Sequence, residues 1–369
     1  MILLMPVAIV VIAAILWDVF ETVVLPRRVD RRLRPSRYLF RLMWYPVRSV
    51  AQKLAQTSSR EVLLGTFGPL SVLLLFVFWA AGLIFGFALL QWSFGHDLAV
   101  GGHHGDFGTA MYMSGSTFVT LGLGDVTPTS GAARSVTAIE AAVGFGFLAL
   151  VIGYLPVLYQ SFSRRELNIS LLDARAGSPP TAGEMLRRYG GTTGDWREAE
   201  QLLLDWERWS ADLLESHISY PLLALFRSQH DHQSWLSALT AMLDFSALIL
   251  ACERDGRLRR PAELAFAMSR HAVVDLTQNF ARELSDPEPP RLTPLDADRL
   301  KPILRARGFD SLDDQAAWQR LSAFRAMYEP YANSLATFFL MPLPRWTPDA
   351  NQIDDWQTSD RGTVLPTRA

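Results

Sequence analysis

Cysteine is almost absent from this sequence, because Cys252 is the only one in 369 residues. A single cysteine excludes an intrachain disulfide framework and a cysteine-cluster metal site. Lysine is nearly as scarce, since only Lys53 and Lys301 are lysines among 35 basic residues, a bias that we attribute to genome composition. An excess of either charge is also missing: the formal net charge of -2 favours neither a nucleic-acid-binding protein nor an acidic tail.

Apolar residues are abundant instead, at 49% of the chain against 20% charged. This is too apolar for a disordered chain and high for an ordinary soluble enzyme. The excess is concentrated in three runs, at residues 2–25, 63–94 and 132–162. Each run is long enough for a membrane-spanning helix, which needs ~20 apolar residues. The first run lacks a basic leader and a small-residue cleavage site, so we predict a retained membrane helix and not a signal peptide.

Basic residues are unevenly distributed between the connecting segments. They crowd residues 27–62, where only Asp30 and Glu61 oppose them, whereas Arg134, at the start of the third run, is the only Lys or Arg in residues 63–163. Arg164 and Arg165 follow the third run directly. The positive-inside rule therefore predicts that residues 27–62 and the C-terminal half are cytoplasmic, with the N-terminus and the second loop outside.

Two acidic residues, Asp18 and Glu21, lie one turn apart near the inner end of the first run. Acids inside a membrane are candidates for function. We interpret these two as structural, because they are close enough to the interface to reach water or the arginines beyond it.

The second loop contains a short segment with the properties of a helix that enters the membrane and returns. Asp106 is a plausible N-cap for a helix over residues 107–119, which is too short to span a bilayer. Backbone of this kind is tolerated at membrane depth only where it lines a cavity or is buried in protein.

Gly122 and Gly124 follow this helix and alternate with Leu121 and Leu123. Glycine adopts backbone angles that are closed to other residues, so the alternation lets successive carbonyls point to one side. Four such strands around an axis would form rings of oxygens that can replace the hydration shell of a monovalent cation.

The run Thr120-Leu121-Gly122-Leu123-Gly124-Asp125 resembles the selectivity filter of the potassium-channel superfamily, usually written T-V-G-Y-G-D. The resemblance covers about residues 63–162 and implies an outer helix, a pore helix, a filter and an inner helix. It further implies a homotetramer that conducts potassium passively, with potassium as the permeant ion and no cofactor. On this resemblance, potassium binds at Thr120, Leu121, Gly122 and Leu123, Gly124 completes the filter, and Thr117 and Asp125 support the filter and its outer mouth.

Two residues depart from the family pattern. Leu123 stands where Tyr or Phe is usual, so the aromatic hydroxyl that ties the filter to the pore helix is missing, although the carbonyl is unchanged. Val119 stands where a second Thr is common, which removes a hydroxyl behind or below the filter. A poorly selective cation channel therefore remains the alternative within this class.

The third run holds two candidates for a gating hinge. Gly144 falls about where the family's inner helix has its hinge glycine, and packing against another helix is the equal alternative. Pro156 cannot donate a hydrogen bond to the carbonyl of Ile152, so we predict an interruption of the helix there. Glu140 is expected to have a structural role, either as a hydrogen-bonding partner behind the filter or as a partner of Arg134.

Histidines offer two further candidates, both of which we interpret as ordinary surface residues. An external proton or metal sensor could be built from His96, His103 and His104 beside Asp97 and Asp106, but a solvated glycine-rich turret is the simpler interpretation. The run His230-Asp231-His232 resembles a metal pair, yet histidines two residues apart diverge on a helix.

The C-terminal half is predicted to be an all-α bundle. Leu202, Trp206, Trp209 and Leu213 follow helical spacing, and a similar stripe runs from Trp318 to Phe338. Other expected helices cover residues 233–252, 261–284 and 295–306. No strand pattern and no Gly-x-Gly-x-x-Gly motif is present, which argues against a nucleotide-binding regulatory domain.

The sequence thus predicts an all-α membrane protein with three transmembrane helices, a re-entrant pore helix and filter, and an all-α cytoplasmic bundle. The predicted segments are residues 1–26 (first membrane helix), 27–62 (basic cytoplasmic linker), 63–162 (pore domain), 163–180 (linker), 181–341 (helical domain) and 342–369 (irregular tail).

We expect a potassium channel of the bacterial inner membrane and not an enzyme. Its expected partners are the lipid bilayer, three further copies of the chain and an unknown cytoplasmic ligand or partner, without nucleic acid. The alternative from another class is a membrane-anchored sensor or enzyme that acts through the helical half.

Overall fold

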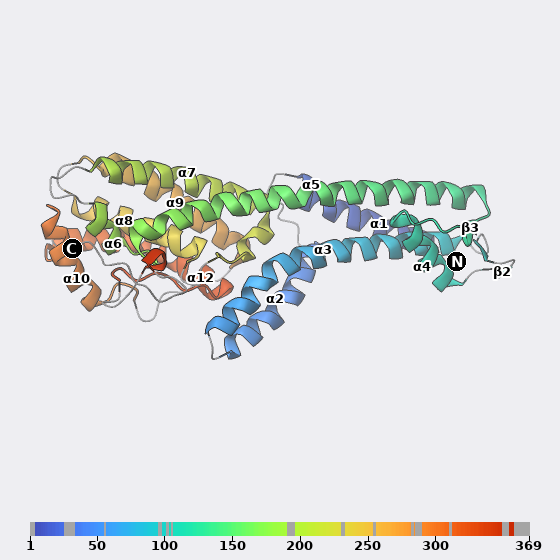
Figure 1. The fold of residues 1–369 in the computed structure, drawn as a ribbon, viewed down its shortest axis with the longest axis horizontal. Coiled ribbons are helices and arrows are strands. Elements are labelled where there is room, and N and C mark those ends of the chain that lie inside the picture. The colour runs from blue at the N-terminus through green and yellow to red at the C-terminus, as the bar shows by residue number, and fades with distance from the viewer. Residues whose placement is uncertain are drawn as a thin grey trace. The chain divides into compact units, whose positions relative to one another are not determined.

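The computed structural model divides the chain into two compact units, Met1–Gln160 and Ser161–Ala369, here called the N-terminal and C-terminal units. Helices dominate both units (Figure 1). The structure describes residues 4–25, 34–54, 57–94, 98–100, 103–104, 106–189, 196–229, 233–253, 256–281, 284, 290–309, 312–348 and 354–357.

The N-terminal unit is built from the three predicted apolar runs and the segments between them. Its elements are α1 (Leu4–Val19), the π-helical turn η1 (Phe20–Val24), α2 (Pro35–Lys53), α3 (Thr57–Ser93), β1 (Leu98–Val100), β2 (His103–His104), α4 (Phe107–Phe118), β3 (Val126–Pro128) and α5 (Gly131–Ala176). Helix α2 was not predicted, since residues 27–62 were treated only as a basic linker. It begins with Pro35 in its first turn, a position where proline's fixed φ suits a helix.

Among the residues that the structure describes, four helical segments are long and apolar enough to cross a membrane, by length and composition alone: α1 with η1, α3, α5 and α8 (Trp235–Cys252). The first three correspond to the predicted spans. Helix α8 differs, because 94% of its apolar window is already buried inside the protein, against 17% for α5. It therefore has almost no surface to offer to lipid and forms the centre of the C-terminal unit.

Helix α1 packs on α3 through two small residues of α3. A Cβ atom added at Gly86 would lie 2.7 Å from Ile12 Cγ1, and one added at Gly82 would lie 3.1 Å from Ile15. Small residues four apart let two membrane helices approach closely. The extra first helix is therefore an integral part of the N-terminal unit.

The acidic pair of the first helix is buried at the junction of α1, α2 and α3. Asp18 accepts hydrogen bonds from Trp79 Nε1 at 2.8 Å and from the backbone and hydroxyl of Ser36 at 3.1 and 2.9 Å. Arg34 Nε lies 3.7 Å from Glu21 Oε2. The predicted structural role beside an arginine is confirmed. The other alternative, contact with water, is not observed, because both carboxylates are buried.

The C-terminal unit is an all-α bundle, as predicted. It contains the end of α5, α6 (Ala182–Tyr189), α7 (Arg197–Ser219), the 3-10 turn η2 (Pro221–Leu225), α8, α9 (Arg259–Phe280), α10 (Pro294–Ala306), α11 (Gln315–Ala326), α12 (Glu329–Phe339) and the short turn η3 (Asp355–Gln357). Helix α8 packs on α9 and α11, and α7 packs on α9.

Two details of this unit differ from the prediction. The stripe from Trp318 to Phe338 belongs to two helices, α11 and α12, because Pro330 lies in the first turn of α12 and starts a new helix there. Residues 163–176, expected as the start of a linker, continue α5, because the Gly-Ser-Pro-Pro stretch that ends the helix begins only at Gly177.

The end of α5 forms part of the core of the C-terminal unit through Arg165, which is buried. Its guanidinium donates to the carbonyls of Leu223 and Phe226 at 3.0 and 2.7 Å and binds Glu166 Oε1 at 2.9 Å. His217 lies beside it, and burial lowers the pKa of His217 well below its usual value, assisted by the positive charge of Arg165. All three guanidinium nitrogens of Arg165 are therefore hydrogen-bonded inside the bundle.

Candidate functional site

The site begins with α4, whose first turn is fixed by Asp106. Asp106 Oδ1 accepts hydrogen bonds from the backbone N–H and the hydroxyl of Thr109 at 2.8 and 2.9 Å. These bonds lower the pKa of the Asp106 carboxyl, and the charged form suits the positive end of a helix dipole. The predicted N-cap is confirmed, and the helix ends at Phe118, one residue earlier than predicted.

The chain leaves α4 by turning back on the helix's last carbonyls. Thr120 N donates to Thr117 O at 3.0 Å, and Leu121 N donates to Ser116 O at 2.8 Å. Gly122 N lies 3.4 Å from the same Ser116 oxygen. The first residues of the predicted filter are thus held by the carbonyl end of α4, a role of Ser116 that the sequence did not indicate.

Residues 120–124 have an alternating backbone. The φ angles of Thr120, Gly122 and Gly124 are +59°, +56° and +79°, whereas Leu121 and Leu123 do not have positive φ. A Cβ atom at Gly122 or Gly124 would meet no atom within 4 Å, so these glycines are needed for their backbone conformation and not for space. Positive φ at every second residue is the geometry that the glycine spacing predicted.

The C-terminal end of this segment is tied to α4 by a side-chain pair. The hydroxyl of Tyr112 hydrogen-bonds the carboxylate of Asp125, directly after the alternating residues. A hollow of about 160 Å³, lined by Tyr112, Thr117, Gly122 and Asp125 among others, lies between the segment and α4. The structure thus brings together the predicted supports Thr117 and Asp125, and it adds Tyr112.

A small three-stranded sheet follows the same part of the chain. Its strand order is β2-β1-β3, and β1 is antiparallel to both neighbours. Leu98 pairs with Pro128 and Val100 with Val126, so β3 connects the C-terminal end of the alternating segment to β1. This segment was interpreted from the sequence as a solvated glycine-rich turret, and the sheet was missed because its strands are only two or three residues long.

Helix α5 contacts α4 closely at Gly144. A Cβ atom at Gly144 would lie 2.1 Å from the carbonyl oxygen of Phe118, the last residue of α4. Of the two alternatives for this glycine, close packing is the one that the structure shows. Helix α5 also continues through Pro156, where an interruption was predicted, because the proline removes one backbone hydrogen bond without ending the helix.

Glu140 lies one turn before Gly144 and is fully buried. Its Oε1 contacts the hydroxyl of Ser114 on α4, and the same hydroxyl lies 2.7 Å from the carbonyl oxygen of Ile84 on α3. The hydrogen bond behind the filter is therefore the alternative that the structure shows. Arg134 instead donates to the carbonyl of Pro128 at 3.2 Å.

The histidine candidates are largely outside the described residues. This applies to His96, Asp97 and the run 230–232. His103 and His104 are described only as strand β2. Among the residues that the structure describes, no group of three or more His, Cys, Asp or Glu side chains could hold a metal ion.

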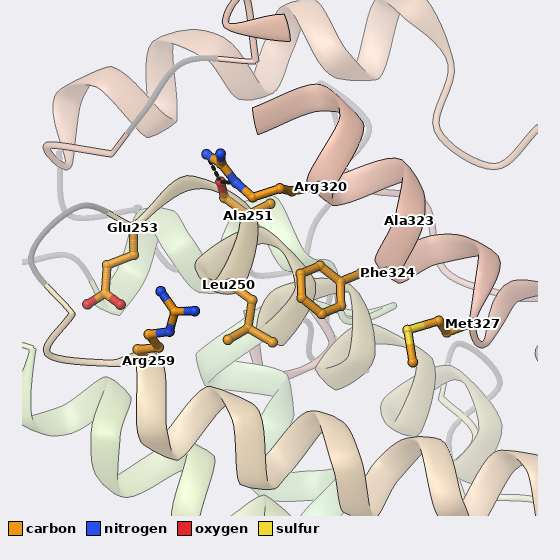
Figure 2. Close-up of a pocket in the computed structure, with 8 residues that line it drawn as sticks. All are labelled: Leu250, Ala251, Glu253, Arg259, Arg320, Ala323, Phe324 and Met327. Carbon is orange, nitrogen blue, oxygen red and sulfur yellow. Dashed lines mark hydrogen bonds between the residues drawn. The ribbon is translucent and has the colours of Figure 1, made fainter. Parts of the chain in front are cut away.

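A larger hollow, of about 490 Å³, lies in the C-terminal unit between the end of α8, the start of α9 and α11 (Figure 2). Arg320 donates to the carbonyl of Ala251 from Nε and Nη2, at 2.9 and 2.7 Å, and thereby caps the C-terminal end of α8. Leu250, Phe324 and Met327 give the hollow an apolar wall. The lining is thus partly charged and partly apolar, and the expected cytoplasmic ligand or partner stays a prediction.

Comparison with known proteins identifies one part of the chain. Residues 72–160 match the protein family described as ion channel. The matched segment begins in α3, includes α4 and the alternating residues 120–124, and ends at the last residue of the N-terminal unit. No curated protein and no solved structure matches the chain. The match supports an ion channel whose pore domain is of the potassium-channel type.

Proposed function

We propose that this ion channel conducts potassium selectively and passively through a pore formed by four copies of the chain. The observation that carries the proposal is the backbone of residues 120–124, where positive φ falls on every second residue. Carbonyls turned to one side by such alternation, stacked in rings, replace the hydration shell of potassium. Thr120 would offer its hydroxyl and carbonyl at the inner ion site, with the carbonyls of Leu121, Gly122 and Leu123 above it.

The surface of a single chain supports assembly. The side chains of Val119, Leu121 and Leu123 are 62%, 58% and 63% exposed, although all three are apolar. Exposed apolar residues also follow the membrane part of α5, at Ile139, Phe145, Leu148 and Ile152. One chain supplies one filter strand, so a closed ring of carbonyls requires symmetric copies, and we propose four.

The structural supports of the filter fit this proposal. Tyr112 holds Asp125 at the outer end, and Ser116 holds Leu121 at the inner end. The helix dipole of α4 places partial negative charge at its C-terminal end, where the filter begins, which favours a cation there. These contacts stabilise the filter in place of the aromatic hydroxyl that is missing at Leu123.

We propose Pro156 as the place where α5 bends in a lower gate, because it removes a backbone hydrogen bond from an otherwise continuous helix. We propose packing against α4 as the main role of Gly144, because a hinge there would have to break its contact with Phe118. We place the channel in the bacterial inner membrane, with the N-terminus outside and the C-terminal unit in the cytoplasm.

The test compares filter variants of the full chain in lipid bilayers. Gly122→Ala forces a Cβ into the left-handed backbone region, whereas Gly131→Ala changes a glycine outside the filter that has open space and no positive φ. Across a potassium/sodium gradient, the wild type and Gly131→Ala should show reversal potentials set by potassium. Gly122→Ala should lose the current or its selectivity, while still forming a tetramer by native mass measurement.

The alternatives predict different results. A wild-type reversal potential near zero across the gradient would indicate a poorly selective cation channel. Normal potassium current in Gly122→Ala would show that residues 120–125 are not a selectivity filter. A protein with no current, but with an activity in the C-terminal unit, would favour the membrane-anchored sensor or enzyme.

A further inference from the structure

Three helices of the N-terminal unit meet at one buried hydroxyl. Ser114 Oγ, on α4, contacts Glu140 Oε1 on α5 and lies 2.7 Å from the carbonyl oxygen of Ile84 on α3. Ser114 and Glu140 are both fully buried within a single chain. Assembly with other chains therefore cannot expose either side chain without moving these helices.

Counting protons decides how these groups are bonded. A serine hydroxyl has one proton to donate, and a backbone carbonyl can only accept. Both contacts of Ser114 are satisfied together only if Ser114 donates to Ile84 and Glu140 donates to Ser114. Glu140 can donate only when its carboxyl group carries a proton.

The surroundings of Glu140 give no support to a charged carboxylate. Its Oε2 is buried and has no hydrogen-bond donor among the described residues. Helix α3 carries charge only at Arg60 and Glu61, near its start, and α4 has Tyr112 as its only titratable side chain, which is bonded to Asp125. On α5 itself, Arg134 is bonded to the carbonyl of Pro128. Among the described residues, an ionised Glu140 would thus be a buried charge with no opposite charge beside it, which is strongly disfavoured.

We propose that Glu140 is a protonated positioning residue, whose carboxyl group donates the hydrogen bond that holds the pore helix α4 between α3 and α5. The proposal rests on the proposed function, because its expected effect is a change in the selective potassium current through the filter. Ser114 lies two residues before Ser116, whose carbonyl holds Leu121 and Gly122. One turn beyond Glu140, Gly144 fits against the carbonyl of Phe118 at the end of α4. The proton on Glu140 therefore fixes the helix end from which the filter starts.

Loss of this proton has a defined consequence. An ionised Glu140 can only accept, so Ser114 turns its proton toward Glu140 and releases Ile84. The new charge also draws water toward a site that is otherwise apolar. We therefore expect the selective current to fall as pH rises and to return when pH is lowered.

The experiment records potassium current from the full-length channel in bilayers over a series of pH values. Glu140→Gln keeps the shape and offers an amide N–H to Ser114 that does not titrate, so its current should be close to wild type at low pH and should not fall at high pH. Glu140→Leu cannot donate, and its current or selectivity should be reduced at every pH. Glu198→Gln changes an exposed acid at the start of α7 and should keep the wild-type pH profile.

A second measurement does not depend on conduction. The infrared spectrum of the wild-type protein should contain the carbonyl band of a protonated carboxylic acid that is missing in Glu140→Gln and present in Glu198→Gln. Failure of potassium selectivity in the wild type would overturn the proposed function and leave this band in place. No difference in the band, a wild-type current that does not change with pH, or loss of current at low pH in a correctly assembled Glu140→Gln would overturn the role of Glu140.

Discussion

Replacing Gly144 by alanine tests the contact between α5 and the end of α4. The added Cβ would lie 2.1 Å from Phe118 O, 2.9 Å from its carbonyl carbon and 3.0 Å from its Cα, whereas ordinary contacts are 3.4–4 Å. All three are backbone atoms, so no side chain can rotate away and one helix must move. Overpacking costs ~1–3 kcal/mol, and we expect the upper end of that range here.

Helix propensity acts in the opposite direction. Alanine stabilises a helix by ~1 kcal/mol relative to glycine, so Gly144→Ala should lose ~2 kcal/mol in net stability. Gly146→Ala is the matched control, because it lies on the same helix and its Cβ would meet no atom within 4 Å. It keeps the gain in propensity without the clash, so the two variants should differ by ~3 kcal/mol.

The assay is chemical unfolding of the purified full-length protein in detergent, combined with potassium flux into vesicles. We expect Gly144→Ala to unfold more readily and to conduct with altered selectivity, because the start of the filter is displaced. If Gly144→Ala is as stable as Gly146→Ala and keeps its selectivity, the packing role is wrong. A change in channel opening alone, with unchanged stability, would favour the hinge.

Four further predictions concern the filter, the pore helix, the C-terminal unit and the topology. Leu123→Tyr should still conduct, with equal or higher preference for potassium in reversal-potential measurements; loss of current would contradict this. Asp106→Ala should destabilise α4 more than Asp106→Asn in unfolding experiments. Because hydrogen bonds lower the pKa of Asp106, the stability that the wild type gains over Asp106→Asn from its charged carboxylate is present near neutral pH and is lost as pH falls through that lowered pKa. Arg165→Met should cost ~3 kcal/mol, since it leaves buried carbonyls unpaired, whereas exposed Arg164→Met should be nearly neutral by thermal unfolding. Ala132→Cys should react with an impermeant thiol reagent on intact cells and Gln201→Cys only after permeabilisation; the reverse result would overturn the orientation.

The parts of the site that could be predicted from the sequence depend on neighbours along the chain. The N-cap Asp106 and its helix are local, and the alternation at residues 120–124 follows from glycine itself. The apolar runs likewise located the spans. Each of these signals lies within one continuous stretch of the chain, so one sequence is sufficient to find them.

The contacts that support the filter could not be predicted in this way. Glu140 and Ser114 are 26 residues apart, and Tyr112 is separated from Asp125 by the whole filter. Such pairs depend on how α3, α4 and α5 pack. Helix α2 was missed for a different reason. Its basic residues were used only to predict the orientation, although they also form part of an amphipathic helical pattern. Length and composition alone would allow α8 to span a membrane, and its packing shows that it is covered by protein.

The continuity of α5 has a consequence for how the length of this helix can change. Glu140 and Gly144 lie one turn apart on α5, and both face α4, at Ser114 and Phe118. Each residue of an α-helix turns the chain by about 100°, so inserting one residue between them would point one of the two away from α4. Each added residue also lengthens the helix by ~1.5 Å, so an insertion that restores the direction still separates the two contacts. Viable insertions and deletions in the membrane part of α5 should therefore lie outside residues 140–144.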